Sequence, residues 1–174
     1  MKAFKYFLIS SLIIFSFISI SSKAIIPTHK LNSIKEFLPS GSFRGGSAGV
    51  GFSILSLKRV YSTDGHSERL IFEIGDKDGH LQSGNTGYFH AQLFRNPSQF
   101  SLDFSQLLLS KVSSTQLKKL ISKSKLIQNA DLTSDFEDHS TNVSLQFKAP
   151  IKMRVFTLSP YKKSAKLVVD FTKM

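Results

Sequence analysis

The sequence predicts a mainly β protein: a β-sandwich of two small sheets, built from an internally duplicated strand pattern, with one short connecting helix. Three observations lead to this prediction. From Phe52 onward, apolar and polar residues alternate in short runs that are separated by turn residues, which is typical of half-buried strands. A single amphipathic segment with a capping pattern interrupts these runs. Finally, the run "FSLDF" returns near the C-terminus as "LVVDF", each time at the end of a similar series of strands.

Residues 1–24 have the layout of a secretory signal peptide. Lys2 and Lys5 precede an apolar run over residues 6–20, and small residues lead to a plausible cleavage site at Ala24. The alternative is an uncleaved membrane anchor, although a span needs about 20 apolar residues. The chain contains no cysteine, which excludes both a lipoprotein modification and a disulfide framework. We therefore expect an exported protein with no stable membrane span once the signal is removed.

The chain is basic, with 23 Lys and Arg against 12 Asp and Glu. Removing Lys2, Lys5 and Lys23 with the signal lowers the first of these counts by three and leaves a net charge of about +8. Export makes nucleic acid an unexpected partner. Export together with the positive charge favours anionic partners in the envelope, either peptidoglycan with its stem-peptide carboxylates or lipid phosphates. The alternative is that the surplus of lysine serves solubility alone.

Residues 25–51 are predicted to be a flexible linker, and residues 52–174 a single domain. The linker segment is rich in glycine and contains Pro27 and Pro39, with a short helical hint over residues 31–38. Its run "GGSAGVG" resembles a phosphate-binding loop, but such a loop needs a strand before it and a helix after it. Here a strand-like segment follows instead.

Four strands are predicted in the first half of the domain. Residues 52–61 alternate, "STDGHS" forms a turn, and residues 68–74 place Leu70, Phe72 and Ile74 on one face. A long turn-rich loop, "GDKDGHLQSGNTG", leads to a strand over residues 88–94. After the turn "RNPS", residues 100–104 close the series.

A helix is predicted over residues 114–124. Ser113 and Gln116 fit a capping box, and Val112 can pack on Leu117 across the cap. We expect this helix to cover one end or edge of a sheet. Leu117, Leu120 and Ile121 form its apolar face, and Lys118, Lys119 and Lys123 form its solvent-exposed face.

The second half repeats the strand series of the first. Strands are predicted over residues 144–147, 152–158 and 167–171. "ERLIFEI" matches "TNVSLQF", "YFHAQLFRNP" matches "KMRVFTLSP", and "FSLDF" matches "LVVDF". The spacing differs between the copies, which predicts two related sheets rather than a solenoid.

Asp103 and Asp170 end the two repeated runs and are predicted to point away from the core. In each run the flanking large apolar residues share the opposite face. Each carboxylate can accept hydrogen bonds from nearby backbone N–H groups or pair with an arginine on a neighbouring strand, and Arg95 and Arg154 are the candidates. We expect each aspartate to orient a cation rather than to perform chemistry.

No pattern of catalytic residues is found, and the protein is predicted to be neither an enzyme nor dependent on a metal or cofactor. The segment "DLTSDFEDH" lacks the spacing and the glycine of a calcium loop and is read as a solvated acidic loop. There is no cysteine nucleophile and no nucleophile elbow around a serine. The five histidines show no metal-ligand spacing; they are His29, His66, His80, His90 and His139.

Three stretches of the chain resemble a known family. "RVFTLSPYKKSAKLVVDF", "GFSILSLKRVYSTDGHSERLIFEI" and "LFRNPSQFSLDF" resemble the AMIN domain, the N-terminal module of periplasmic N-acetylmuramoyl-L-alanine amidases that also occurs in pilus secretins. The resemblance covers roughly residues 52–171 and lies in the order and doubling of the runs. It implies a β-sandwich in the periplasm that binds peptidoglycan and localises whatever it is attached to.

The leading hypothesis is therefore a non-catalytic peptidoglycan-binding module. Arginine and amide side chains would bind stem-peptide carboxylates and sugar hydroxyls. The candidate ligand-binding residues are Arg69, Arg95, Asn96, Arg154 and Tyr161, with Asp103 and Asp170 as orienting residues.

Two alternatives remain. Open strand edges favour a protein-interaction accessory of an envelope complex, with an amidase, a type IV pilus secretin or a divisome protein as partner. The basic run "KKLISKSK" would suit a binder of anionic lipid, although its apolar side fits a core-facing helix.

Overall fold

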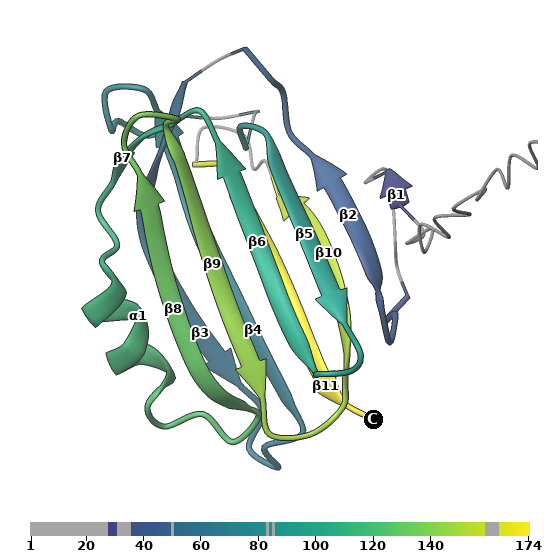
Figure 1. Cartoon of the computed structure of the whole chain (residues 1–174). Helices are drawn as coiled ribbons and strands as arrows, with labels where there is room; N and C mark the ends of the chain where they lie inside the picture. The colour runs from purple at the N-terminus through teal and green to yellow at the C-terminus, as the bar shows by residue number, and fades with distance from the viewer. Residues whose placement is uncertain (1–27, 31–35, 50, 83, 85, 159–163) are drawn as a thin grey trace, which may run out of the picture.

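The computed structural model describes residues 28–30, 36–49, 51–82, 84, 86–158 and 164–174. They form two stacked β-sheets and one helix, which confirms the predicted sandwich (Figure 1). The six-stranded sheet, in front in Figure 1, has the order β1-β2-β5-β6-β9-β8, and the five-stranded sheet has the order β10-β11-β4-β3-β7. The elements are β1 (Thr28–Lys30), β2 (Gly41–Gly45), β3 (Phe52–Tyr61), β4 (Ser67–Asp76), β5 (Phe89–Phe94), β6 (Gln99–Ser105), β7 (Leu107–Ser110), α1 (Ser114–Ile121), β8 (Ile127–Asp135), β9 (Ser140–Phe147), β10 (Ile151–Leu158) and β11 (Lys166–Lys173).

The duplicated halves occupy equivalent places in opposite sheets. In one sheet the order β5-β6-β9-β8 places the end of the first half beside the start of the second. In the other sheet the order is β10-β11-β4-β3. There β11, the last strand of the second half, lies beside β4 of the first half. The two central pairings, β6 with β9 and β11 with β4, are both antiparallel and both join one half to the other.

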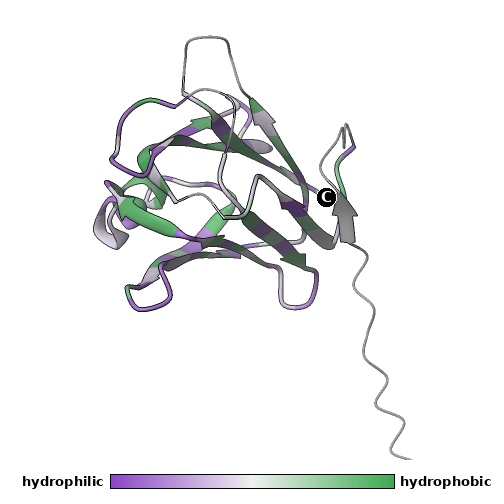
Figure 2. Cartoon of the chain, turned by 90° about the horizontal axis from the view of Figure 1, so that it is seen from above, coloured by the Kyte–Doolittle hydropathy of each residue, from purple (hydrophilic) through white to green (hydrophobic). Residues whose placement is uncertain are grey.

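Phenylalanine rings fill the space between the sheets. Phe104 makes edge contacts with Phe52 and Phe72, at 5.9 and 5.6 Å between ring centroids. Phe171 lies 5.2 Å from Phe100 and 5.0 Å from Phe147 by the same measure. Such edge-to-face arrangements add to the burial of apolar area. Figure 2, seen from above, shows the two sheets as separate layers. The buried residues of both sheets form one hydrophobic core.

The prediction of a flexible linker over residues 25–51 is wrong for its described part. Residues 41–45 form β2, which pairs antiparallel with β5 and extends the six-stranded sheet. Phe43 in this strand is 0% exposed and belongs to the core. Strand propensity did not reveal β2, because glycine and serine surround a single large apolar residue.

The helix forms as predicted at its start but is shorter at its end. Ser113 and Gln116 make both hydrogen bonds of the capping box, and Leu117 and Ile121 are buried. The helix ends at Ile121 rather than at Ser124. It packs mainly beside β8, at one side of the sandwich in Figure 1.

The predicted acidic loop "DLTSDFEDH" is in part a strand, because β8 runs to Asp135 before the turn to β9. The backbone N–H groups of Glu137 and Asp138 donate hydrogen bonds to the Asp135 carboxylate, at 3.0 and 3.2 Å, and shape that turn. Residues 127–135 contain few large apolar side chains, so their alternation was too weak to predict a strand.

One carboxylate faces inward and fixes the segment after the helix. Glu68 on β4 is 2% exposed. Its Oε1 atom accepts hydrogen bonds from the Ser124 hydroxyl at 2.7 Å and from the backbone N–H of Lys125 at 2.9 Å. Its Oε2 atom accepts a bond from Arg59 Nη1 at 3.0 Å. A buried charge needs such partners, so Glu68 anchors the α1–β8 connection to the other sheet.

The predicted signal peptide, residues 1–24, lies outside the described residues. Within the part of the chain that is described, no helix has both the length and the apolar character needed to cross a bilayer.

Replacing Phe104 should test the shared core. We expect Phe104→Ala to lower the free energy of unfolding by about 3–5 kcal/mol, because it removes a fully buried ring that touches two others. Phe94→Ala is the matched control, since Phe94 is 38% exposed, and it should cost about 1 kcal/mol or less. Urea unfolding followed by circular dichroism measures both, and equal losses would contradict a single core that unites the sheets.

Candidate functional site

Three charged side chains meet on the outer face of the five-stranded sheet. The register places Asp170 of β11 between Arg154 of β10 and Arg69 of β4. Arg69 donates from Nε and Nη2 to the two carboxylate oxygens of Asp170, at 2.6 and 3.0 Å. Arg154 donates from Nη2 and Nε to Asp170 Oδ2, at 2.6 and 3.2 Å. We call these three residues the arginine cluster.

A row of apolar side chains lies beside the arginine cluster on the same face. Phe156, Val168 and Ile71 each lie two positions from a cluster residue on their own strand, and they are in register with one another across the three strands. The Phe156 ring lies under both guanidinium groups, 5.3 Å from that of Arg154 and 5.6 Å from that of Arg69. Phe37, from the segment before β2, lies 4.8 Å from the Arg154 guanidinium. These cation–π contacts add to the hydrogen bonds of Asp170 in holding both arginines in place.

The cluster borders an open pocket of about 400 Å³. Its charged and polar lining includes Arg69, Arg154 and Asp170, and its apolar lining includes Phe37, Val60 and Ile71. Tyr61, at the end of β3, stands at its edge and is exposed. The pocket therefore combines cations with apolar walls.

The electrostatics leave the cluster positively charged. Burial alone would raise the pKa of Asp170, but the hydrogen bonds and charges of Arg69 and Arg154 outweigh burial and lower it. The pKa of Arg69 is raised by its hydrogen bonds to Asp170. One carboxylate thus serves two guanidinium groups, and a net charge of one positive unit remains at neutral pH.

Asp103 occupies the equivalent position in the six-stranded sheet. It lies between His90 of β5 and Asn142 of β9, which correspond to Arg154 and Arg69. Its carboxylate accepts a hydrogen bond from Asn142 Nδ2, which also bonds Ser101. Burial and the nearby Arg44 lower the pKa of His90, which favours its neutral form. The duplication therefore produced two equivalent positions, and they carry different charges.

The structure brings together three of the predicted site residues and leaves the others, including Asp103, elsewhere. Arg69, Arg154 and Asp170 come together. Arg95 and Asn96 lie exposed in the turn between β5 and β6, and the expected pairing of Arg95 with Asp103 is wrong because His90, not Arg95, stands opposite that aspartate. The prediction of one common surface therefore fails for Arg95 and Asn96. Tyr161 lies outside the described residues.

Sequence reasoning missed the aromatic partners of the arginines. Phe156 has an outward position in its strand, because Val155 and Met153 face the core. An apolar residue on the solvent-facing side of an alternating strand was the signal that could have revealed it. Phe37 carried no comparable signal, because it belongs to a segment without strand periodicity.

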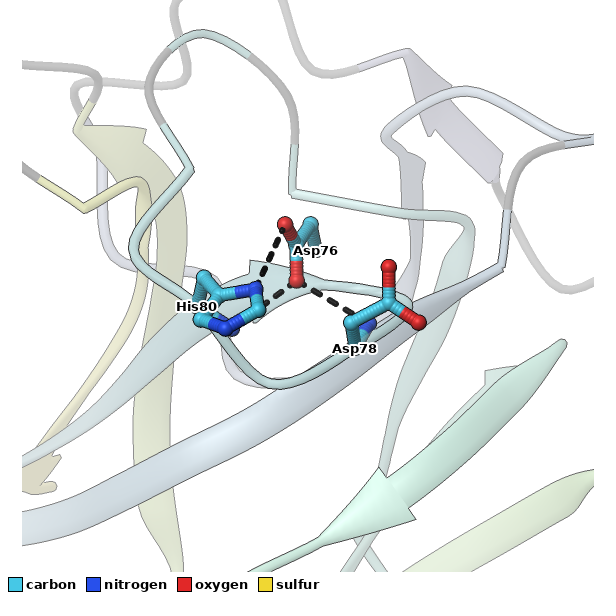
Figure 3. Close-up of side chains that lie close together, drawn as sticks. All are labelled: Asp76, Asp78 and His80. Carbon is cyan, nitrogen blue, oxygen red and sulfur yellow. Dashed lines mark hydrogen bonds and ion pairs between the residues drawn. The ribbon is translucent and has the colours of Figure 1, made fainter.

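A second group of polar side chains lies in the loop after β4. Asp76, Asp78 and His80 approach one another closely enough to share a cation (Figure 3). The Asp76 Oδ1 atom already accepts the backbone N–H groups of His80 and Asp78, at 2.8 and 3.0 Å. These hydrogen bonds lower the pKa of Asp76, and the bond from the His80 N–H has the larger effect. The geometry is that of an aspartate-stabilised turn, which explains why the three side chains lie close together. His66 lies at the opposite end of β4, so it does not converge with His80.

The fold and the arginine cluster define a class of protein: a small β-sandwich with an outward-facing cationic site on one sheet. No protein-family model matches the sequence, and a search of the curated proteins finds no match.

Acid titration should reveal the role of Asp170. Because its folded-state pKa is lowered, its ionised form contributes stability above the unfolded-state pKa of about 3.9, and this stability is lost as pH falls through the folded-state value. We expect Asp170→Asn to lower the free energy of unfolding by about 1–3 kcal/mol at pH 7 and by less near pH 3.

The control is Asp103→Asn at the equivalent position, which keeps an acceptor oxygen for Asn142 and leaves no arginine without its partner. It should cost less at pH 7. Urea unfolding at both pH values measures these changes. If Asp170→Asn lowers the free energy of unfolding as much near pH 3 as at pH 7, the ion-pair interpretation is contradicted.

Proposed function

We propose that this chain is a non-catalytic, periplasmic module that binds peptidoglycan through the arginine cluster. The observation that carries the proposal is the convergence of Arg69 and Arg154 on one carboxylate, beside an open pocket with apolar walls. Asp170 would orient the two guanidinium groups, and the guanidinium groups would bind the carboxylates of the stem peptides.

Arg69 has donor capacity left for a ligand. Its Nε and one Nη2 hydrogen are used by Asp170, whereas its Nη1 group donates no hydrogen bond to the described residues. Its side chain is 42% exposed, so a carboxylate can reach it from solvent. A planar fork of N–H groups suits a carboxylate better than a point charge does.

The apolar row suits the alkyl part of a short peptide. A terminal alanine presents a carboxylate and a methyl group a few ångströms apart. In the pocket, the carboxylate would meet Arg69 while the methyl group contacts Ile71 or Phe37. The volume of about 400 Å³ lies in the range of about 300–1,000 Å³ that is typical of ligand pockets.

The cluster is poorly suited to catalysis. A carboxylate with a lowered pKa and four hydrogen bonds from guanidinium groups is a weak general base. The net positive charge, the predicted signal peptide and the resemblance to AMIN domains support an envelope location and a binding role.

Binding to purified sacculi tests the proposal. We expect the chain to sediment with sacculi at moderate salt, and Arg69→Lys to weaken binding about tenfold, because lysine keeps the charge but loses the fork of donors. Arg95→Lys is the matched control, since Arg95 lies in an exposed turn of the other sheet, and it should bind like the unaltered chain.

Sacculi whose carboxylates have been amidated should retain little of the protein if stem-peptide carboxylates are the ligand. Two outcomes would overturn the proposal: sedimentation no greater than that of a neutral control protein, or equal effects of Arg69→Lys and Arg95→Lys.

A protein-interaction accessory of an envelope complex, such as a pilus secretin or the division machinery, is a second candidate function. A different feature supports it: part of the β3 edge has no strand partner among the described residues. Co-purification of a specific partner that persists after digestion of the cell wall would favour this function over the first.

A further inference from the structure

Strand β3 is paired along only part of its outer edge. It pairs with β4 over its whole length, but with β7 only from Phe52 to Ile54. The backbone N–H of Lys111 donates to the Ile54 carbonyl at 2.9 Å, and the chain then turns away into α1. A register shift between Ile54 and Ser56 marks this point. From Ser56 to Tyr61, β3 is regular and has no strand on its outer side within the described ranges.

A groove of about 650 Å³ lies between this open edge and the helix. Leu55 and Leu57 of β3 contribute one apolar wall, and Val112, Leu117 and Leu120 contribute the other. The helix leaves this space because it packs mainly against β8, in the opposite sheet. An unpaired strand edge beside an apolar groove is the arrangement that accepts an added strand.

The rim of the groove is cationic. Lys119 and Lys123 are four residues apart in sequence, line the groove and are exposed. Neither makes an ion pair with a described carboxylate, whereas Lys118, on another face of the helix, pairs with Asp131 at 3.1 Å. Lys111 also lines the groove, at the point where β7 ends. The charges therefore favour an acidic occupant.

We propose that this groove binds an extended, acidic peptide segment of a partner protein, which adds to β3 as a new edge strand. The six residues from Ser56 to Tyr61 offer about 20 Å of edge, which is the length of an ordinary strand. Alternate side chains of the peptide would lie on Leu57 and Leu120, and its acidic side chains would lie near Lys119 and Lys123. This inference does not rest on peptidoglycan binding, because no residue that lines the groove also lines the pocket beside the arginine cluster. The two surfaces adjoin at Val60 and Tyr61, which belong to the strand edge and also line that pocket.

Fluorescence anisotropy with a labelled decapeptide of alternating glutamate and valine tests the proposal on the full-length chain. We expect this peptide to bind at least about tenfold more tightly than a decapeptide of alternating lysine and valine. The acidic peptide with methylated backbone nitrogens at alternate residues cannot form the ladder of hydrogen bonds and should bind no better than the basic one. Hydrogen exchange should show protection of amides within residues 56–61 when the acidic peptide is bound.

The variant that carries both Lys119→Glu and Lys123→Glu should weaken binding of the acidic peptide about tenfold. The matched control carries Lys77→Glu and Lys173→Glu, the same charge change at two exposed lysines outside the groove, and should bind as the unaltered chain does. Arg69→Lys should also leave peptide binding unchanged, which separates this result from the test of peptidoglycan binding.

Three outcomes would overturn the inference. Equal affinity for the acidic and basic peptides would contradict the role of charge. If the peptide protects amides from exchange only outside residues 56–61, it does not add to β3 as a strand. Binding to vesicles of phosphatidylcholine and phosphatidylglycerol in equal amounts, abolished by the double lysine variant and without binding of the acidic peptide, would assign the lysines to a lipid surface instead.

Discussion

The exchange of strands between the two halves is the constraint on which this structure depends. β6 pairs with β9 and β4 pairs with β11, so each sheet is completed by strands from the other half. The aromatic core follows from this exchange, because Phe100 of the first half packs on Phe171 of the second. Neither half has a complete sheet of its own within the described residues. The two copies are therefore expected to fold as one cooperative unit.

The exchange also assembles the arginine cluster. Arg69 comes from the first half, and Arg154 and Asp170 come from the second. The equivalent place on the other sheet holds His90, Asp103 and Asn142, which form a less charged arrangement on the same backbone plan. One duplicated position thus provides two outward faces with different chemistry. The face with Arg69 and Arg154 concentrates positive charge beside an apolar row.

The segment that joins the halves breaks the symmetry and creates the second surface. β7 and α1 lie in this connection, where β7 covers the start of β3 and α1 stands away from the rest of its edge. Glu68 holds the end of this segment through Ser124 and Lys125, so the helix is fixed at a distance from the strand. The groove is a consequence of that fixed distance. The five-stranded sheet therefore carries a cationic pocket on its outer face and a cationic groove beside its β3 edge.

The sequence by itself determined the local features. Alternation of apolar residues identified most strands and the outward position of Asp103 and Asp170, and the side chains of Ser113 and Gln116 identified the start of the helix. The sequence offered Arg154 as a candidate partner of an aspartate on the neighbouring strand, and the structure pairs it with Asp170. Neighbouring strands from different halves were not predictable, because their pairing depends on residues far apart in sequence: Arg69 and Asp170 are separated by 101 positions. For the same reason β2 was missed, since Phe43 is buried only by strands that come later in the chain. The tertiary structure alone decided that Arg154, rather than Arg95, has an aspartate beside it, because register places one arginine opposite Asp170 and leaves the other in a turn.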